Sequence, residues 1–182
     1  KRRVTLSTSG VVPALDKLAK VSEVSLAVSL HAPNDALRSQ LVPINRKYPL
    51  VDFIGSAKRY LDKMPDNRRK VTVEYTLMDR VNDRDEHAKE LSVLLRDLPC
   101  KINLIPFNPF PGSEYKKVTK VALNRFRDIL HNDGYTVTVR TKNVARPFIS
   151  GRVGLVDQTH IGCEAHQVFE KLPLTMPLPV DV

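Results

Sequence analysis

Four polar residues in this sequence are of types that bind small polar ligands, and each lies where a β-strand is expected to end. Ser7 and Ser29 offer hydroxyl groups, His31 offers an imidazole and Asn108 offers a side-chain amide. Hydroxyls, amides and one imidazole, with few charges nearby, suit a neutral or zwitterionic ligand with ribose-like or amino-acid-like groups. The five histidines form no HxH or HExxH motif, and no GxGxxG or Walker loop is present.

Each of these residues also has a purely structural explanation. A serine at a strand end commonly bonds the backbone, and an imidazole can cap a turn. Asn108 lies between Phe107 and Pro109, where asparagine is a frequent turn former. The aromatic rings of Phe107 and Phe110 suit base stacking or, more simply, core packing.

Strands are expected at 3–8, 24–28, 71–78, 100–105 and 135–140, with helices between them. The segment 24–28 is apolar apart from Ser25, as in a strand covered on both faces. Pro33 then blocks strand pairing, and Asn34 or Asp35 is suited to cap the next helix.

Alternating strands and helices predict parallel strands joined by right-handed crossovers. Five such units are too few for a closed eight-stranded barrel, so the expected fold class is α/β, a partial, open TIM-like barrel with outer helices. The carboxyl ends of parallel strands share one rim. On this rim we expect Ser7, Thr8, Ser9, Ser29, His31, Asp79, Asn82, Asn108 and Arg140, with Glu74 further inside.

Residues 1–140 carry this pattern, whereas 141–182 has no helix-length apolar face and is expected to be a weakly ordered tail. The last 42 residues hold four basic and four acidic side chains, so the whole net charge of +9 lies in residues 1–140. Such an excess favours an anionic partner, with nucleic acid first among the candidates.

No apolar run approaches the ~20 residues of a membrane helix, and no signal-peptide pattern precedes Val4. The two cysteines, Cys100 and Cys163, form neither a disulfide framework nor a CxxC motif. We therefore expect a cytoplasmic protein without a membrane anchor. Cys100 is expected to be a small buried apolar residue and not a nucleophile.

Several ungapped motifs resemble one family in order and spacing. They are Ser-Thr-Ser-Gly-Val-Val-Pro at 7–13, Ser-Leu-His-Ala-Pro-Asn-Asp at 29–35, Val-Pro-Ile-Asn at 42–45, Glu-Tyr at 74–75, Val-Asn-Asp at 81–83 and Ile-Asn-Leu-Ile-Pro-Phe-Asn-Pro at 102–109. The resemblance is to the radical S-adenosylmethionine (SAM) methyltransferases that modify adenine C2 in RNA, the RlmN and Cfr family. It covers about residues 1–140.

The resemblance implies a partial barrel of the radical SAM type that holds SAM and a [4Fe-4S] cluster. Residues matching Ser7, Ser29, Leu30, His31 and Asn108 contact SAM in that family, and all five are present. Implied partners are 23S ribosomal RNA, transfer RNA and an electron donor for the cluster, and we expect a monomer. One SAM would methylate a cysteine thiolate, and a second, cleaved reductively, would supply the radical that activates this methyl for attack on adenine.

Two departures from the family pattern lead us to expect an incomplete chain. The CxxxCxxC motif that binds the cluster would lie before Lys1, so no cluster ligand is expected here. The Ala-Cys-Gly-Gln segment with the methyl-carrying cysteine is absent after Arg140, and Cys163 lies between Gly162 and Glu164. A reading-frame error is one hypothesis for this end. The alternatives left open are a catalytically dead RNA-binding chain and a small-molecule lyase or aldolase on the same half-barrel.

Overall fold

The structure is a computed structural model that describes residues 4–65 and 69–140. The tail expected at 141–182, with Cys163, lies outside the described residues. All five expected strands are present: β1 Thr5–Thr8, β2 Ser25–Ser29, β3 Val71–Leu77, β4 Cys100–Pro106 and β5 Thr136–Val139. The helices are α1 Val12–Val21, α2 Asp35–Leu41, α3 Leu50–Asp62, α4 Asp85–Leu95 and α5 Lys120–Asn132, with a short 3₁₀ helix at Pro43–Arg46.

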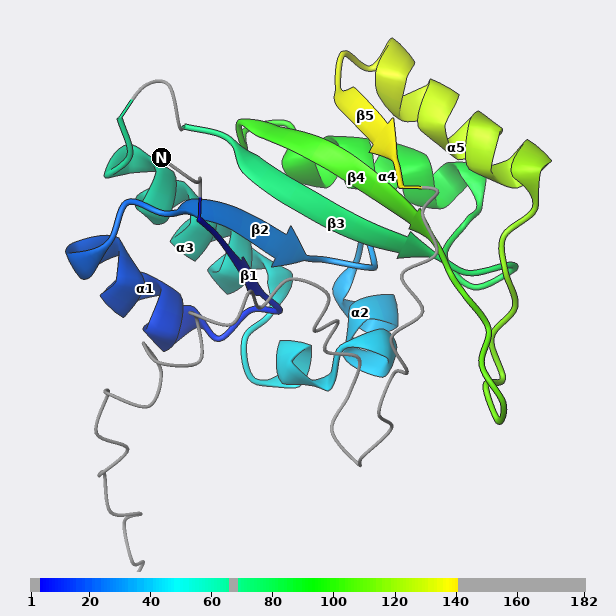
Figure 1. The fold of residues 1–182 in the computed structure, drawn as a ribbon, viewed down its shortest axis with the longest axis horizontal. Coiled ribbons are helices and arrows are strands. Elements are labelled where there is room, and N and C mark those ends of the chain that lie inside the picture. The colour runs from blue at the N-terminus through cyan, green and yellow to red at the C-terminus, as the bar shows by residue number, and fades with distance from the viewer. Residues whose placement is uncertain (1–3, 66–68, 141–182) are drawn as a thin grey trace, which may run out of the picture.

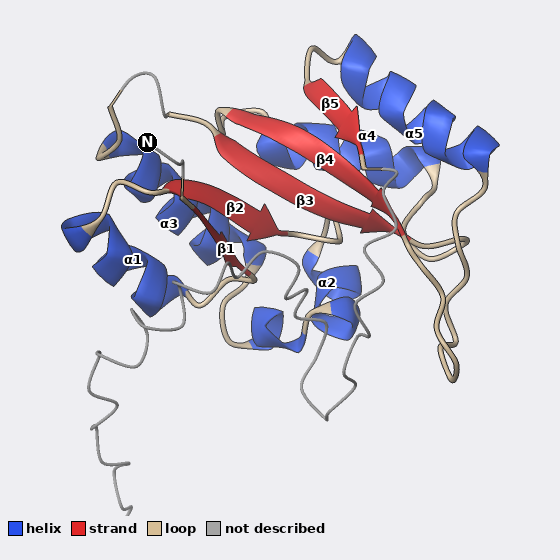
Figure 2. Ribbon diagram, in the orientation of Figure 1, coloured by secondary structure: helices blue, strands red, loops and turns tan. Residues whose placement is uncertain are grey.

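The five strands form one parallel sheet in the order β1-β2-β3-β4-β5 (Figures 1 and 2). Within the described residues, β1 and β5 are each paired on one side only, so the sheet is open. The expectation of an open α/β half-barrel is therefore confirmed. In Figure 1 all the arrowheads point toward one side of the molecule, and α2 lies beyond the end of β2. This side is the carboxyl edge of the sheet, where the candidate residues were expected.

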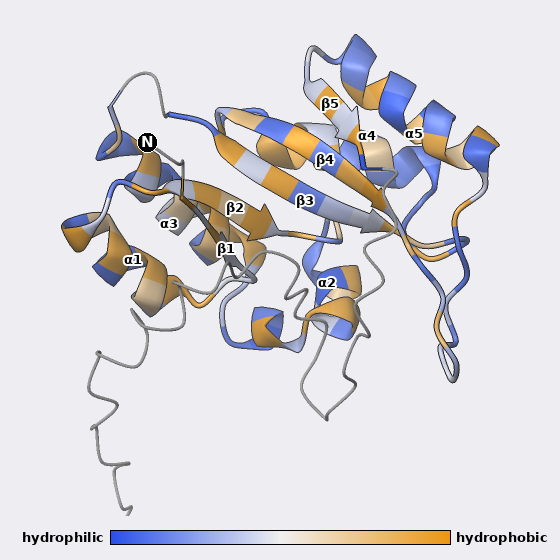
Figure 3. Ribbon diagram, in the orientation of Figure 1, coloured by the Kyte–Doolittle hydropathy of each residue, from blue (hydrophilic) through white to orange (hydrophobic). Residues whose placement is uncertain are grey.

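One face of the sheet packs against the helices and forms the main core. Along β3, Val71, Val73, Tyr75 and Leu77 belong to this core and are fully buried. The intervening residues, Thr72, Glu74 and Thr76, carry polar side chains that point to the opposite face. Figure 3 shows the same alternation of hydrophobic and hydrophilic residues along β4. The period of two thus separates a packed face from a polar face, on which Glu74 and Thr76 are also buried.

A smaller apolar cluster lies at the carboxyl edge itself. It consists of Ala32, Leu41, Val42, Met78 and Phe107, with Phe110 and Tyr115 packed against it. The Phe107 ring lies 6.3 Å from the Phe110 ring and 6.0 Å from the Tyr115 ring, measured between centroids, and is only 7% exposed. Core packing is therefore the role of Phe107, which fixes the loop after β4 against the end of the sheet.

Helix α2 begins as the sequence predicts. Asn34 is the N-cap, and its Oδ1 accepts a hydrogen bond of 3.0 Å from the Leu37 backbone N–H. Among the described residues, none of the helices has the length and apolar content needed to cross a membrane.

Candidate functional site

The parallel register brings the predicted residues to one edge of the sheet. Ser7 on β1 is in register with Ala27, and Ser29 on β2 is in register with Glu74 on β3. Asn108 is the second residue after β4 and is exposed. Ser7 is half-buried and Ser29 is buried, and within the described chain neither hydroxyl makes a hydrogen bond. Among the described residues, neither serine therefore shows the backbone hydrogen bond that the structural explanation expects.

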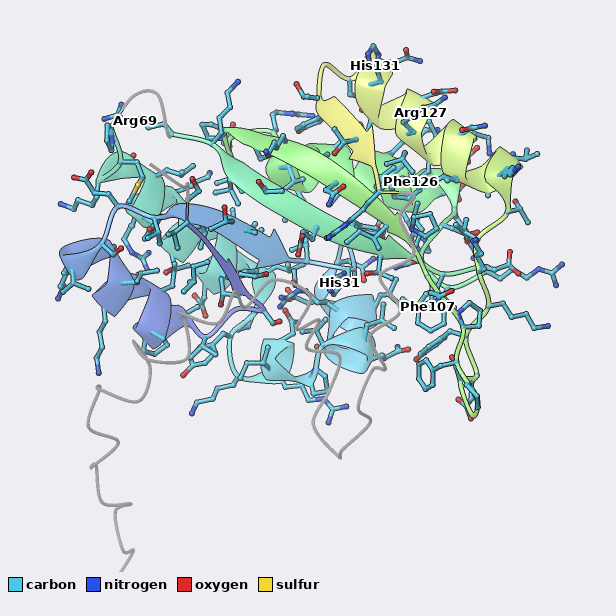
Figure 4. The ribbon with its side chains drawn as sticks, in the orientation of Figure 1. His31, Arg69, Phe107, Phe126, Arg127 and His131 are labelled. Atoms are coloured by element: carbon cyan, nitrogen blue, oxygen red, sulfur yellow. The ribbon has the colours of Figure 1, made fainter. Side chains whose placement is uncertain are left out.

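His31 has a conformation that only a specific local structure would maintain. Its φ is +61°, in the left-handed region that residues with a Cβ rarely occupy, and its side chain is 1% exposed. The Thr76 backbone N–H donates a hydrogen bond of 3.1 Å to His31 Nδ1. Because a backbone N–H can only donate, Nδ1 must be the acceptor, and the proton of the neutral ring is on Nε2. The ring orientation and tautomer of His31 are thus set by β3 (Figure 4).

Leu30 differs from the other predicted residues because its side chain is fully buried in the main core. Its backbone N–H donates to the Glu74 carbonyl at 3.0 Å. Leu30 therefore anchors the turn to the protein interior. Its side chain holds Ser29 and His31 in place on either side.

Arg38 on α2 joins the ends of β1 and β2, and sequence reasoning missed it. The guanidinium donates to three carbonyl oxygens, those of Ser9 at 2.7 Å, Leu30 at 3.1 Å and Ser29 at 3.3 Å. It is fully buried and lies 4.9 Å from the centre of the Phe53 ring. Burial lowers the pKa of Arg38 to about 10, so the guanidinium is charged at neutral pH.

A second layer of polar residues orients Arg38. Asn45 Oδ1 accepts a hydrogen bond of 2.8 Å from Arg38, and Asn45 Nδ2 donates to the Asp35 carboxylate at 2.8 Å. The same Asp35 oxygen accepts from the Leu50 N–H at 2.8 Å. One sequence signal points to this network, because Arg38 occupies the apolar face of its helix, three residues before Leu41.

Asn82 was expected on the polar rim, and the structure shows that its amide is hydrogen-bonded to backbone groups of the protein. Its Nδ2 donates to the carbonyls of Thr76 at 2.7 Å and His31 at 2.8 Å, and its Oδ1 accepts from the Met78 N–H at 2.8 Å. Asn82 is fully buried. It ties the loop after β3 to the His31 turn, which is a structural role and not a ligand contact.

Cys100 is half-buried at the opposite end of the sheet, at the start of β4. Burial raises the pKa of its thiol to about 11, so the thiolate is scarce at neutral pH. The expectation that Cys100 is not a nucleophile is consistent with this environment.

The donor set at the edge fits SAM but not an iron–sulfur cluster. Two hydroxyls, an oriented imidazole and an exposed amide match the ribose and amino-acid groups of SAM. The described residues contain no group of three or more His, Cys, Asp or Glu side chains arranged to hold a metal.

Two of the curated relatives align with most of this chain at high sequence identity. Each is a "Dual-specificity RNA methyltransferase RlmN": the Saccharophagus degradans protein is 67% identical over 141 residues, and the Marinobacter nauticus protein is 60% identical over 141 residues. Both alignments cover 78% of this chain. This segment is of the RlmN type. The chain spans 35% and 38% of the lengths of these two relatives. No protein-family model matches the sequence.

Solved structures give the same result for the fold of the RlmN-type segment. A radical SAM methyltransferase from Sphaerobacter thermophilus superposes with a TM-score of 0.72 and 51% identity, covering 76% of this chain and 40% of that protein. A domain of pyruvate-formate lyase-activating enzyme from Bacteroides vulgatus has a TM-score of 0.58 at 16% identity, covering 75% of this chain and 80% of that domain. The second likeness concerns the fold alone.

Proposed function

We propose that this chain forms part of an RNA methyltransferase that transfers a methyl group from SAM to adenine C2 by a radical route, with 23S ribosomal RNA and transfer RNA as substrates. The observation that carries the proposal is the 67% identity to a curated RlmN protein. The excess of basic residues in 1–140 supports an RNA partner. A cytoplasmic location agrees with RNA substrates and with only two cysteines.

In this proposal the carboxyl edge of the sheet is one wall of the SAM site. Ser7 and Ser29 contribute hydroxyls to SAM, the buried ring of His31 supports the wall beside Ser29, and Asn108 contributes its amide. Leu30 contributes through the turn that it anchors in the core. SAM, when bound, supplies the methyl group, and the residues of this wall bind and orient it.

The proposal can be tested by exchanging matching segments. The 141 matching residues of the Saccharophagus degradans relative are replaced by those of this chain, and the chimera is expressed in a bacterium lacking its own adenine-C2 methyltransferase. We expect 2-methyladenosine in ribosomal and transfer RNA by mass spectrometry. In the same chimera, Ser29→Ala or His31→Ala should lower the yield at least tenfold. A stable chimera that makes no 2-methyladenosine, beside an active parent, would contradict the proposal.

A further inference from the structure

Arg80 is an arginine at a position where the backbone favours glycine. Its φ is +57°, and its side chain is 91% exposed. Within the described chain, its one polar contact is an ion pair of 3.9 Å between its Nε and Asp79 Oδ2. Neither packing nor hydrogen bonding explains an arginine here. A strained residue whose side chain contacts so little is a candidate for binding something outside the protein.

The turn that carries Arg80 is rigid and is attached to the candidate site. The Val81 N–H donates to the Met78 carbonyl at 3.2 Å, and the buried Tyr75 hydroxyl donates to the Asn82 carbonyl at 3.0 Å. Asn82 also donates to the His31 carbonyl. Arg80 therefore lies two residues from the asparagine that holds the His31 turn, and little conformational freedom of its backbone remains to be lost on binding.

Two lysines join Arg80 through a backbone contact between loops. Met78 and Lys117 form an antiparallel bridge, and the Asp79 N–H donates to the Lys116 carbonyl at 3.0 Å. Lys116 and Lys117 are both exposed. The packing of Tyr115 against Phe107 fixes the loop that carries them, and Figure 4 shows Phe107 and His31 on the same side of the sheet's carboxyl edge.

We propose that Arg80, Lys116 and Lys117, here called the cationic rim, contact the phosphate backbone of the RNA beside the SAM site. This inference rests on the proposed function for its RNA partner. The carboxylates of Asp79 and Glu114 lie in the same two segments, so the local excess is one positive charge. Two rigid loops hold these cations beside the proposed SAM site, where they would contact the RNA strand next to the target base.

The experiment measures binding of the 182-residue chain to a fluorescently labelled RNA stem-loop by anisotropy, at several salt concentrations. Arg80→Gly and Arg80→Asn are informative because both residues accept the left-handed backbone. We expect each variant to melt at the same temperature as the wild type or higher. We expect the slope of log K against log salt to be about one unit shallower, and affinity near 0.15 M salt to be about fivefold weaker.

Two further variants separate the cationic rim from net charge alone. Lys17→Gln removes one exposed positive charge from α1, at the other end of the sheet, and should leave the slope within about 0.3 of the wild type. Glu114→Gln removes a carboxylate from the rim and should tighten binding about two- to fivefold.

The outcomes separate failure of this inference from failure of the proposed function. If the wild type binds RNA with a salt-dependent affinity and Arg80→Gly matches Lys17→Gln, the cationic rim is refuted and the RNA partner stands. If the wild type binds no RNA at any salt concentration, both the rim and the RNA contact of this segment are refuted. A shallower slope for Arg80→Gly, with unchanged melting, supports the rim.

Discussion

Replacing Arg38 by methionine should destabilise the protein strongly, because one buried guanidinium holds the ends of two strands. Arg38 makes four hydrogen bonds, to the carbonyls of Ser9, Ser29 and Leu30 and to Asn45 Oδ1, at 2.7 to 3.3 Å. Each hydrogen bond to a charged group contributes about 1.5–3 kcal/mol, while the buried charge itself costs several kcal/mol in desolvation. The difference leaves an expected loss of about 3–5 kcal/mol in the free energy of unfolding.

Urea unfolding followed by circular dichroism measures this loss, and hydrogen exchange locates it. The backbone N–H groups of Leu30 and His31 should exchange faster in Arg38→Met. Arg38→Lys keeps the charge but loses the planar fork, so it should recover less than half of the lost stability.

Tyr60→Phe is the matched control for Arg38. The Tyr60 hydroxyl donates to the Val24 carbonyl at 2.7 Å, just before β2 begins. The control therefore loosens the opposite end of the same strand and should cost about 1 kcal/mol without affecting exchange at His31. A stability of Arg38→Met within about 1 kcal/mol of the wild type, or unchanged exchange at Leu30 and His31, would refute the reasoning.

Three other predictions concern single side chains. Asn82→Asp replaces an amide that donates to two carbonyls by a carboxylate oxygen, so it should lower the free energy of unfolding by at least about 3 kcal/mol at neutral pH. Part of this loss should be recovered near pH 4, where the carboxyl group becomes protonated. Equal urea midpoints of the variant at both pH values would contradict this prediction. The hydrogen bond from Ser56 and the Arg59 guanidinium lower the pKa of Asp16 below its ordinary value of 3.8. The ionised Asp16 therefore stabilises the folded protein above pH 3.8, and this contribution is lost as the pH falls through the folded-state pKa. Asp16→Asn should therefore lower stability by up to about 1 kcal/mol at pH 7, since the pair is largely exposed, and by less near pH 2; a pH-independent difference in urea titrations would exclude this linkage. In a Cys163→Ser background, Cys100 should resist iodoacetamide at pH 7.5 and react once the chain is unfolded in urea. The reason is that burial raises the pKa of the Cys100 thiol to about 11 in the folded protein. Rapid labelling of the native protein, measured by mass spectrometry, would contradict this prediction.

The sequence by itself determined the order and type of the elements. The signals are local: the spacing of hydrophobic residues, Pro13 near the start of α1 and Asn34 at the start of α2. They favour a strand or a helix through interactions between residues that are close in the sequence. The five-strand alternation also predicted an open parallel sheet, since the right-handed crossover restricts the topology. The polar residues at strand ends could then be placed at one edge without coordinates.

Only the tertiary structure decided which of those polar side chains are hydrogen-bonded within the protein. In the sequence, Asn82 and Ser29 were both polar residues at the end of an expected strand. In the structure, the Asn82 amide is hydrogen-bonded to three backbone groups, whereas the Ser29 hydroxyl makes no hydrogen bond within the described residues. The position of Arg38 three residues before Leu41 indicates a buried arginine, but only the fold shows that it lies between two strand ends. Hydrogen-bond satisfaction and desolvation depend on neighbours that are distant in the sequence, so local pattern alone could not assign these roles.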